Sequence, residues 1–259
     1  MDAMKKNSEI IIFPSRNDLY QFAAKDFYHR AISAVNNKGI FSVVLAGGKT
    51  PQLFFDTLSS KNYQKNIPWQ KIQFFFGDER YVPADDLQSN YHMANEHLFS
   101  RVPVNPDQIF RIPTDFNDPK EAAENYEQTL RKVFHTQENA FPPFDVVYLG
   151  LGENAHTASL MPFSEVVIQH LENPLPEKNK QLVTSLFVTT ENRFRITLTP
   201  NAIDHSNDII FLVTGSNKAN AVFEVLEGQT DPLHYPAQLI QSASGKTFWF
   251  LDQAAAKKL

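Results

Sequence analysis

The 259-residue sequence contains no cysteine, which excludes disulfide bonds, thiolate nucleophiles and metal sites ligated by cysteine. Such a composition is typical of the reducing cytosol. No stretch approaches the roughly 20 apolar residues that a membrane-spanning helix needs. The first apolar run, residues 10–13, is too short for a secretory signal. We therefore expect a soluble, cytoplasmic protein with no membrane partner.

An excess of positive charge, internal repeats and low-complexity linkers are also lacking. Twenty-four Lys and Arg against 29 Asp and Glu give a formal net charge of −5 at pH 7, which argues against a nucleic-acid partner. A local basic pocket for a small anion remains compatible with this charge. The chain is long enough to bury a sizeable core. We expect one domain over residues 1–259.

Apolar runs alternate along the chain with segments of helical spacing. The spacing predicts helices over residues 17–35, 50–58, 90–99, 118–134 and 217–226. Strands are predicted over residues 40–45, 71–76, 109–112, 144–149, 182–188, 195–198, 209–213 and 247–251. A polar loop is expected over residues 77–89, and the tail from residue 254 is expected to fray. The alternation predicts an α/β fold, an open and mostly parallel sheet with helices on both faces. A small subdomain in the proline-rich middle is an alternative arrangement.

Residues 46–51 join a predicted strand to a predicted helix. The two glycines, Gly47 and Gly48, allow close approach of a ligand to the backbone, and the helix start offers free N–H donors to an anion. Lys49 and the hydroxyl of Thr50, the expected N-cap, would add contacts. The spacing is not that of a Walker A loop. An anion site and an ordinary capped turn are therefore both open.

Residues 77–90 follow the most aromatic of the predicted strands. Arg80 carries a planar fork of donors that suits a phosphate or sugar hydroxyls, and Asp78 or Glu79 would orient it. A surface ion-pair loop is the simpler alternative. A metal is not expected, because no second histidine or carboxylate stands at ligand spacing.

The most informative segment is residues 150–162, in which His156 follows a strand and a Gly-x-Gly turn. Open α/β sheets bind ligands at the carboxyl ends of their strands, and histidine is well suited to proton transfer near neutral pH. Backbone N–H groups of the turn would stabilise an oxyanion. The polar neighbours Asn154, Thr157 and Ser159 argue against a core histidine. Ser159 does not lie in the Gly-x-Ser-x-Gly motif of a serine hydrolase.

Two further cations, Arg195 and Lys218, lie at or near the ends of predicted strands. Lys218 is expected in the first turn of a helix, where the helix dipole disfavours a cation. A neighbouring anion would explain its position. A solvated surface charge is the alternative for each of the two side chains.

Together these segments resemble the family of glucosamine-6-phosphate isomerases and 6-phosphogluconolactonases. The resemblance rests on five segments in the family order, residues 46–51, 77–90, 150–162, 195–199 and 215–218. The sequence departs from the family pattern at a few positions. Ala46 and Lys49 replace two serines, Asn154 and Ala155 replace an Asp-Gly pair, and Met161 replaces a phenylalanine.

The resemblance implies a fold shared with glucosamine-6-phosphate deaminase, ribose-5-phosphate isomerase and CoA transferases. It implies hydrolysis of 6-phospho-D-glucono-1,5-lactone to 6-phosphogluconate in the oxidative pentose phosphate pathway, without a cofactor or metal. His156 would activate water, with Asp78 as the second catalytic residue. Substrate contacts are expected from Gly47, Gly48, Lys49, Thr50, Arg80, Ser89, Asn90, Asn154, Arg195 and Lys218. The partner would be a small sugar-phosphate lactone, and the protein a monomer or homodimer.

Two alternatives stay open. A glucosamine-6-phosphate deaminase or aldose–ketose isomerase resembles this chain in fold, but it uses a carboxylate shortly after the histidine. Here no acid follows before Glu165. A non-catalytic sugar-phosphate sensor is the second alternative, because Asn154 can only hydrogen-bond where an aspartate would also carry charge. Ala155 further requires that the turn avoid a positive φ or tolerate its cost.

Overall fold

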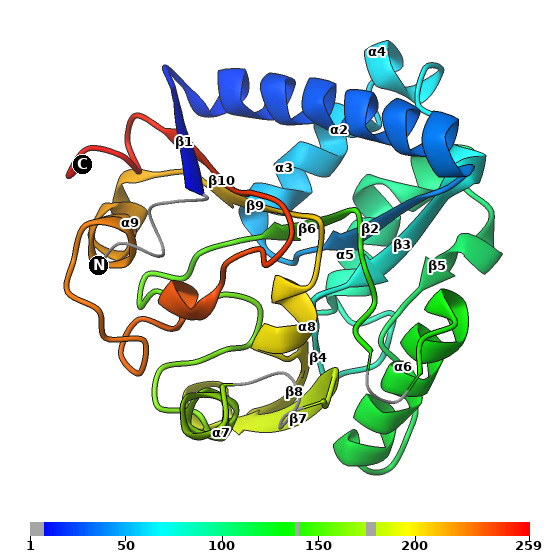
Figure 1. Cartoon of the computed structure of the whole chain (residues 1–259). Coiled ribbons are helices and arrows are strands. Elements are labelled where there is room, and N and C mark those ends of the chain that lie inside the picture. Colours follow the sequence, from blue (N-terminus) through cyan, green and yellow to red (C-terminus); the bar gives the residue numbers. More distant parts are fainter. Residues whose placement is uncertain (1–7, 138–139, 175–179) are drawn as a thin grey trace.

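The structure is a computed structural model that describes residues 8–137, 140–174 and 180–259. Its centre is a seven-stranded sheet in which every neighbouring pair of strands is parallel (Figure 1). The strands lie in the spatial order β1 (Ser8–Phe13), β10 (Thr247–Asp252), β9 (Asp208–Val213), β6 (Val146–Leu149), β2 (Phe41–Leu45), β3 (Ile72–Phe76) and β5 (Ile109–Phe110). The predicted open, parallel α/β architecture is confirmed.

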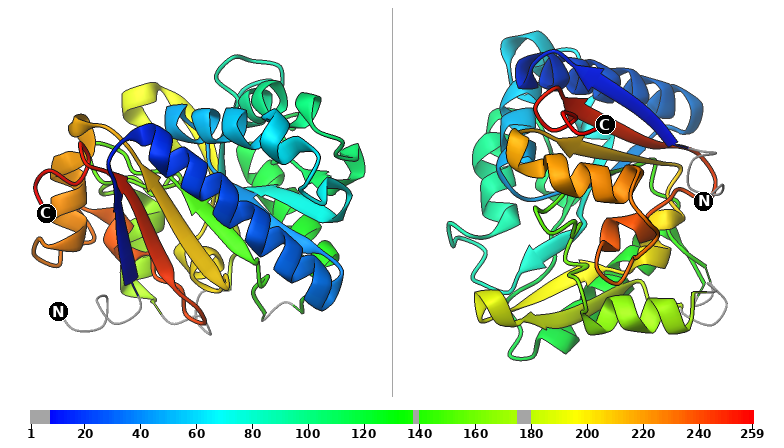
Figure 2. Two further views of the ribbon diagram at one scale, coloured as in Figure 1. Left: turned by 90° about the horizontal axis from the view of Figure 1, so that it is seen from above. Right: turned by 90° about the vertical axis from the view of Figure 1, so that its left-hand side faces the viewer.

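Helices lie on both faces of this sheet (Figures 1 and 2). The α-helices of the described residues are α2 (Arg16–Lys38), α3 (Lys49–Leu58), α4 (Lys61–Gln64), α5 (Asn90–His97), α6 (Pro119–Phe134), α7 (Glu165–Glu172), α8 (Pro200–Asp204) and α9 (Ala219–Leu226). In Figures 1 and 2, α2 and α3 lie on one face of the sheet, and α8 and α9 lie on the other. No helix within the described ranges is long and apolar enough to cross a membrane.

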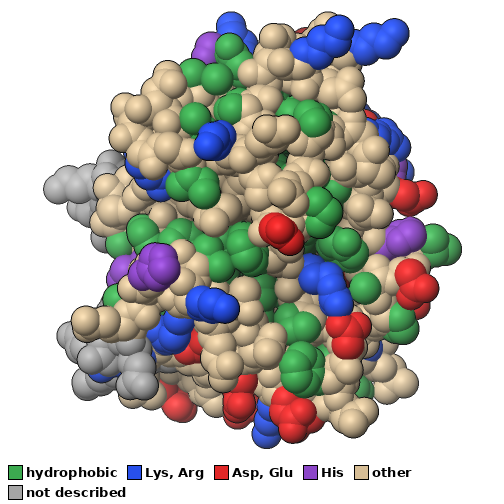
Figure 3. Space-filling model, turned by 90° about the vertical axis from the view of Figure 1, so that its right-hand side faces the viewer, with side chains coloured by type: hydrophobic (Ala, Val, Ile, Leu, Met, Phe, Trp, Pro, Cys, Tyr) green, Lys and Arg blue, Asp and Glu red, His purple; other side chains and the backbone are tan. Residues whose placement is uncertain are grey.

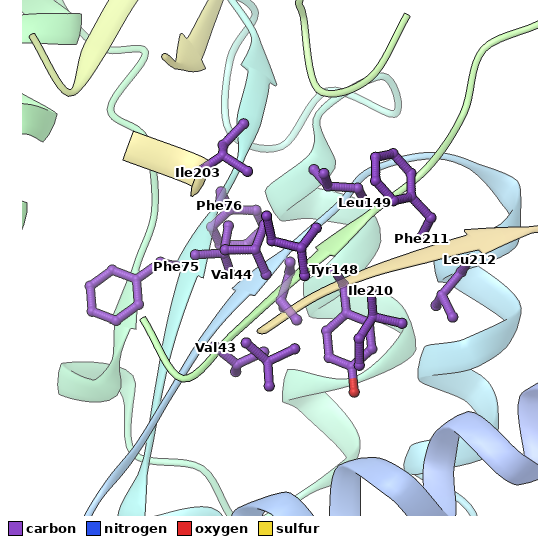
Figure 4. Close-up of a cluster of buried hydrophobic side chains, with 14 of the residues drawn as sticks. Val43, Val44, Phe75, Phe76, Tyr148, Leu149, Ile203, Ile210, Phe211 and Leu212 are labelled. Carbon is purple, nitrogen blue, oxygen red and sulfur yellow. The ribbon is translucent and has the colours of Figure 1, made fainter. Parts of the chain in front are cut away.

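The central strands are buried on both faces, which explains why they are continuous apolar runs rather than alternating ones. All positions of β2 and β6 are buried. Tyr148 and Leu149, successive residues of β6, point to opposite sides of the sheet (Figure 4). The edge strand β1 instead exposes Ile10 and Ile12. On the face drawn in Figure 3, basic and acidic side chains are interspersed.

A second, antiparallel sheet joins β4 (Asp78–Arg80), β8 (Arg193–Leu198) and β7 (Val183–Val188). The prediction of a polar loop over residues 77–89 is therefore wrong for its first part. β4 forms because its backbone pairs with β8, more than 100 residues further along the chain. The local composition of an Asp-Glu-Arg segment gives no sign of such a partner.

Several other predictions need correction at the ends of elements. α3 begins at Lys49 with Gly48 as its N-cap, so Thr50 does not cap it. The tail is packed rather than frayed, because Ala255 is buried and its N–H donates to Asp252. Besides β4, the strand β1 and the helices α4, α7 and α8 fall outside the sequence predictions.

Candidate active site

A cleft of about 560 Å³ opens at the carboxyl ends of the parallel strands. The loops that follow β2, β6 and β9 line it, together with residues of β4, β8 and α2. Of the predicted site residues, the cleft is lined by Gly47, Gly48, Lys49, Thr50, Asp78, Arg80, Asn90, His156, Arg195 and Lys218. The sheet topology thus brings together segments that lie far apart in the sequence, as expected for strand ends of one parallel sheet.

Ser89 and Asn154 are not among the lining residues, and each instead holds a neighbouring side chain. Arg16, Tyr20 and Glu191 line the cleft and were not predicted. The first two lie on α2, which the sequence predicts from apolar spacing alone. Nothing in the local sequence marks these three side chains as cleft residues, because the tertiary fold alone brings them there.

The turn after β6 fixes the imidazole of His156. Asn154 Oδ1 lies 2.6 Å from Nδ1 and can only accept, so Nδ1–H donates the hydrogen bond and Nε2 keeps its lone pair. The N–H of Gly152 donates to the carbonyl of His156 at 2.8 Å. A Cβ at Gly152 would lie 2.1 Å from His156 Nδ1, so only glycine leaves room for the ring in this orientation. Through this hydrogen bond Asn154 orients the imidazole of His156 without placing a charge beside it.

Ala155 adopts a positive φ of 60° and is fully buried. This left-handed conformation costs a residue with a Cβ about 1 kcal/mol. The turn is held in place from both sides, since Ala155 N–H donates to Gly152 at 3.1 Å and its carbonyl accepts from Ala237 at 3.0 Å. The turn therefore keeps a glycine-type conformation with an alanine in it.

The electrostatic surroundings favour a neutral His156. Burial lowers the pKa of the imidazole below its ordinary value. The charge of Asp78 acts against this effect, whereas the charges of Arg195 and Lys218 add to it. A neutral imidazole with a free Nε2 lone pair near neutral pH is the form that a general base requires.

Asp78 is 6% exposed and is held from three directions. Ser159 Oγ donates to Oδ2 at 2.6 Å, Asn90 Nδ2 donates to Oδ1 at 3.1 Å, and Arg195 Nη1 lies 3.4 Å from Oδ2. Ser159 belongs to the same segment as His156, so the carboxylate ties β4 to the histidine turn. A buried carboxylate with this many partners is rigid.

The expectation that Asp78 or Glu79 orients the Arg80 side chain is wrong. Asp78 faces Arg195, and Glu79 accepts hydrogen bonds from the N–H groups of Asn90 and Tyr91 at the start of α5. Arg80 Nη1 donates instead to the carbonyl of Gln88 at 2.9 Å.

Gly47 has a structural function that its sequence motif does not indicate. A Cβ at this position would lie 1.8 Å from Asn90 Oδ1. The bare backbone of Gly47 thus admits Asn90, which donates to both the carbonyl and the carboxylate of Asp78. The glycine loop and the buried carboxylate are coupled through this one amide.

Arg195 is 5% exposed, and its donors are already occupied. Nε lies 3.2 Å from Glu191 Oε2, and Nη2 lies 2.5 and 2.6 Å from the two carboxylate oxygens of Glu191. Nη1 faces Asp78. We call Asp78, His156, Glu191 and Arg195 the paired cluster, because the carboxylates of Asp78 and Glu191 both contact the guanidinium of Arg195.

Four other cations of the cleft, Arg16, Lys49, Arg80 and Lys218, have no carboxylate within 4 Å among the described residues. Arg80 donates to a backbone carbonyl, and we call the other three the cationic cluster. Burial lowers the pKa of the Lys218 ammonium, which the charge of Glu153 partly offsets. A cation that burial disfavours gains most from an anionic ligand.

Hydroxyl groups join the elements that carry the cationic cluster. Thr50 Oγ1 lies 3.1 Å from Thr214 Oγ1, which lies 3.4 Å from the Tyr20 hydroxyl. Gly48, with φ of 100°, is the N-cap of α3, whose first N–H groups lie at the cleft. Cations, hydroxyls and helix N–H groups together suit a phosphate. Among the described residues no group of three or more His, Asp and Glu could hold a metal ion.

The fold and the cleft define an α/β protein equipped for acid–base chemistry on a small anionic ligand. The model of the family described as glucosamine-6-phosphate isomerases/6-phosphogluconolactonase matches residues 14–249, and the chain belongs to this family. The resemblance inferred from the sequence motifs is therefore confirmed.

Individual relatives agree with this assignment. A 6-phosphogluconolactonase of Nostoc is 34% identical over 256 residues, which cover 99% of both proteins. The structure of 6-phosphogluconolactonase from Trypanosoma brucei superposes with a TM-score of 0.83 at 27% identity, over 97% of this chain and 98% of that one. A monomeric glucosamine-6-phosphate deaminase has a TM-score of 0.79 at 20% identity, over 97% and 100% of the two chains, which shows a common fold only.

Proposed function

We propose that this protein hydrolyses 6-phospho-D-glucono-1,5-lactone to 6-phosphogluconate in the oxidative pentose phosphate pathway. The observation that carries the proposal is the oriented, neutral His156 in a cleft that also holds the cationic cluster, whose members have no close carboxylate partner among the described residues. Relatives named 6-phosphogluconolactonase support it along nearly the whole chain. The reaction consumes water and needs no cofactor.

His156 Nε2 takes a proton from a water molecule as the water oxygen bonds to the lactone carbonyl carbon, C1. The resulting tetrahedral intermediate carries an oxyanion, which N–H groups of the turn at residues 150–155 stabilise. The bond between C1 and the ring oxygen then breaks, and His156 returns the proton to that oxygen. The N–H groups of Gly152 and Ala155 donate within the turn, so the oxyanion donors are its other N–H groups.

The cationic cluster binds the phosphate, together with the first N–H groups of α3 and the hydroxyl of Thr50. Binding the phosphate away from the reacting carbon positions C1 against the water. Arg80 contributes to the cleft wall and contacts the sugar. Asn90, Asn154 and Ser89 act through Asp78, His156 and Glu79, respectively, rather than on the substrate.

This arrangement differs from the expectation that Arg195 contacts the substrate. Because Glu191 and Asp78 occupy its donors, we assign Arg195 to the positioning of Asp78 and the region around His156. The same pairing weighs against a deaminase or isomerase. Both carboxylates that line the cleft, Asp78 and Glu191, are engaged with Arg195, and neither is free to move protons at a sugar carbon.

The test is the hydrolysis of freshly prepared 6-phosphogluconolactone by the purified protein, with the spontaneous rate subtracted. Glucosamine 6-phosphate is offered in parallel, with ammonia release as the readout. We expect lactone hydrolysis far above the spontaneous rate and no ammonia. Ammonia release would favour the deaminase. Binding of the product without any acceleration would favour the sensor.

A further inference from the structure

The salt bridge between Arg195 and Glu191 affects how the cleft binds the lactone substrate relative to its hydrolysis product. Glu191 lies in the turn between β7 and β8, four residues before Arg195, and both side chains line the cleft. The Arg195 side chain is 6% exposed and cannot turn into solvent, whereas the Glu191 side chain is 37% exposed. The carboxylate therefore occupies the Nε and Nη2 edge of a buried guanidinium that lines the cleft.

The carboxyl group of Glu191 is ionised near neutral pH. Burial by itself would raise the pKa of Glu191, but the hydrogen bonds and charge of Arg195 bring the pKa below its ordinary value. The charges of Arg80 and Arg193 act in the same direction. Glu191 is thus ionised, and both of its oxygens are engaged with the guanidinium fork.

Hydrolysis changes the charge of the ligand only at C1. The lactone is uncharged at C1, whereas the product carries a carboxylate there, and the phosphate is common to both. A guanidinium with a free fork is among the best carboxylate receptors in proteins. Arg195 and Glu191 line the same cleft as His156, and the charges of both act on its imidazole, so this fork lies at the end of the cleft where His156 would act on C1.

We propose that Glu191 is a specificity-determining residue, which occupies the guanidinium fork of Arg195 and so prevents Arg195 from binding the product carboxylate. The inference rests on the proposed lactonase function. Glu191 thereby lowers the affinity of the cleft for 6-phosphogluconate relative to ligands that are neutral at C1, and it favours product release. Arg195 can still hold Asp78 through Nη1.

Two ligands separate the carboxylate from the rest of the product. 6-Phosphogluconate carries it, and D-glucitol 6-phosphate has the same phosphate and hydroxyl chain without it. Calorimetric titration gives Kd for both with the wild type, Glu191→Gln and a control. In Glu191→Gln we expect 6-phosphogluconate to bind about three- to tenfold more tightly. D-Glucitol 6-phosphate should change by less than about twofold.

The matched control is Glu153→Gln. Glu153 is an exposed carboxylate near the same cleft that accepts a hydrogen bond from Asn217 at 2.7 Å and acts on Lys218 rather than Arg195. Its neutralisation should shift both ligands together, since both carry the phosphate. Glu191→Asp, which keeps the charge, should retain discrimination against the carboxylate and so separates the charge from the loss of the side chain.

Kinetics provide the second readout. In Glu191→Gln the ratio of the product inhibition constant to KM should fall by the same factor as the ratio of the two Kd values. An unchanged preference in Glu191→Gln, with lactone hydrolysis intact in the wild type, would overturn this inference alone. If the wild type neither hydrolyses the lactone nor binds either sugar phosphate, the proposed function fails, and this inference fails with it.

Discussion

The paired cluster and the cationic cluster line one cleft but differ in how their charges are compensated by other side chains. Asp78 and Arg195 are almost fully buried and in mutual contact, and Glu191 completes the set. Lys49 and Lys218 have no carboxylate within ion-pair distance in the described structure. Charges that are neutralised within the protein fix geometry, whereas charges without a partner remain available to a ligand. We therefore expect the paired cluster to control turnover and the cationic cluster to control the affinity for the substrate.

The largest effect is expected at the reacting end. His156→Ala should lower turnover by about 10²- to 10⁴-fold, the range for loss of a general base, with little change in KM. The measurement is steady-state lactone hydrolysis. His29→Ala is the matched control, since His29 lies exposed on α2 and outside the cleft. Equal losses in both variants would remove His156 from the mechanism.

Removal of a charge from the paired cluster should affect both stability and rate. Asp78→Asn leaves the buried Arg195 with Glu191 as its sole carboxylate and weakens the bonds to Ser159 and Asn90. We expect a loss of about 1–3 kcal/mol in the free energy of unfolding, measured by urea denaturation. A fully stable variant would show that the pairing does not hold this part of the structure.

Removal of a charge from the cationic cluster should instead affect affinity. Lys218→Ala loses one charge-assisted contact to the phosphate, so KM should rise about 10- to 100-fold with a much smaller change in kcat. Lys246→Ala is the control, because Lys246 is exposed and paired with Glu9 on the surface. A fall in kcat at constant KM would contradict the division between the clusters.

The partner of the histidine should set the pH dependence. Burial lowers the pKa of His156 below its ordinary value. The imidazole is therefore protonated, and lost as a base, only at a pH below the ordinary pKa of histidine. Asn154→Asp places a negative charge at the Nδ1 contact and favours the protonated ring. The acid limb of kcat/KM should therefore move up by about one pH unit. An unmoved limb in the pH–rate profile would show that another group titrates there.

The smallest effect concerns the strained turn. Ala155→Gly removes the Cβ that the left-handed conformation strains, but it also raises the conformational entropy of the unfolded chain. Because the two effects oppose each other, the free energy of unfolding should either rise or fall by no more than about 0.5 kcal/mol. Ala34→Gly within α2 offers no such relief and should lose about 1 kcal/mol. Equal losses in urea denaturation would mean that the positive φ of Ala155 carries no strain.

The sequence was sufficient to predict the parallel sheet, because each central strand is an apolar run followed by a turn. It also located most cleft residues, because loops at the carboxyl ends of parallel strands converge. It failed for β4, whose polar residues become a strand only by pairing with β8. Arg16, Tyr20 and Glu191 were missed for the same reason, since contacts far apart in the sequence bring them to the cleft.

Ala155 illustrates what a departure from a motif can and cannot reveal. The family pattern has a glycine at this position, which raises the question of a positive φ, and the backbone answers it with φ of 60°. The asparagine at 154 left the orientation of His156 open until the 2.6 Å contact to Nδ1 was visible. Side-chain hydrogen bonds of this kind depend on the turn geometry, which the sequence does not encode locally.

The most direct test of the account is to measure kcat and KM for 6-phosphogluconolactone side by side in the wild type, His156→Ala and Lys218→Ala. We expect His156→Ala to lose turnover at saturating substrate, whereas Lys218→Ala should approach wild-type turnover once the substrate concentration is high enough. Turnover that survives in His156→Ala, or that stays lost at saturation in Lys218→Ala, would contradict the assignment of chemistry to one cluster and phosphate binding to the other.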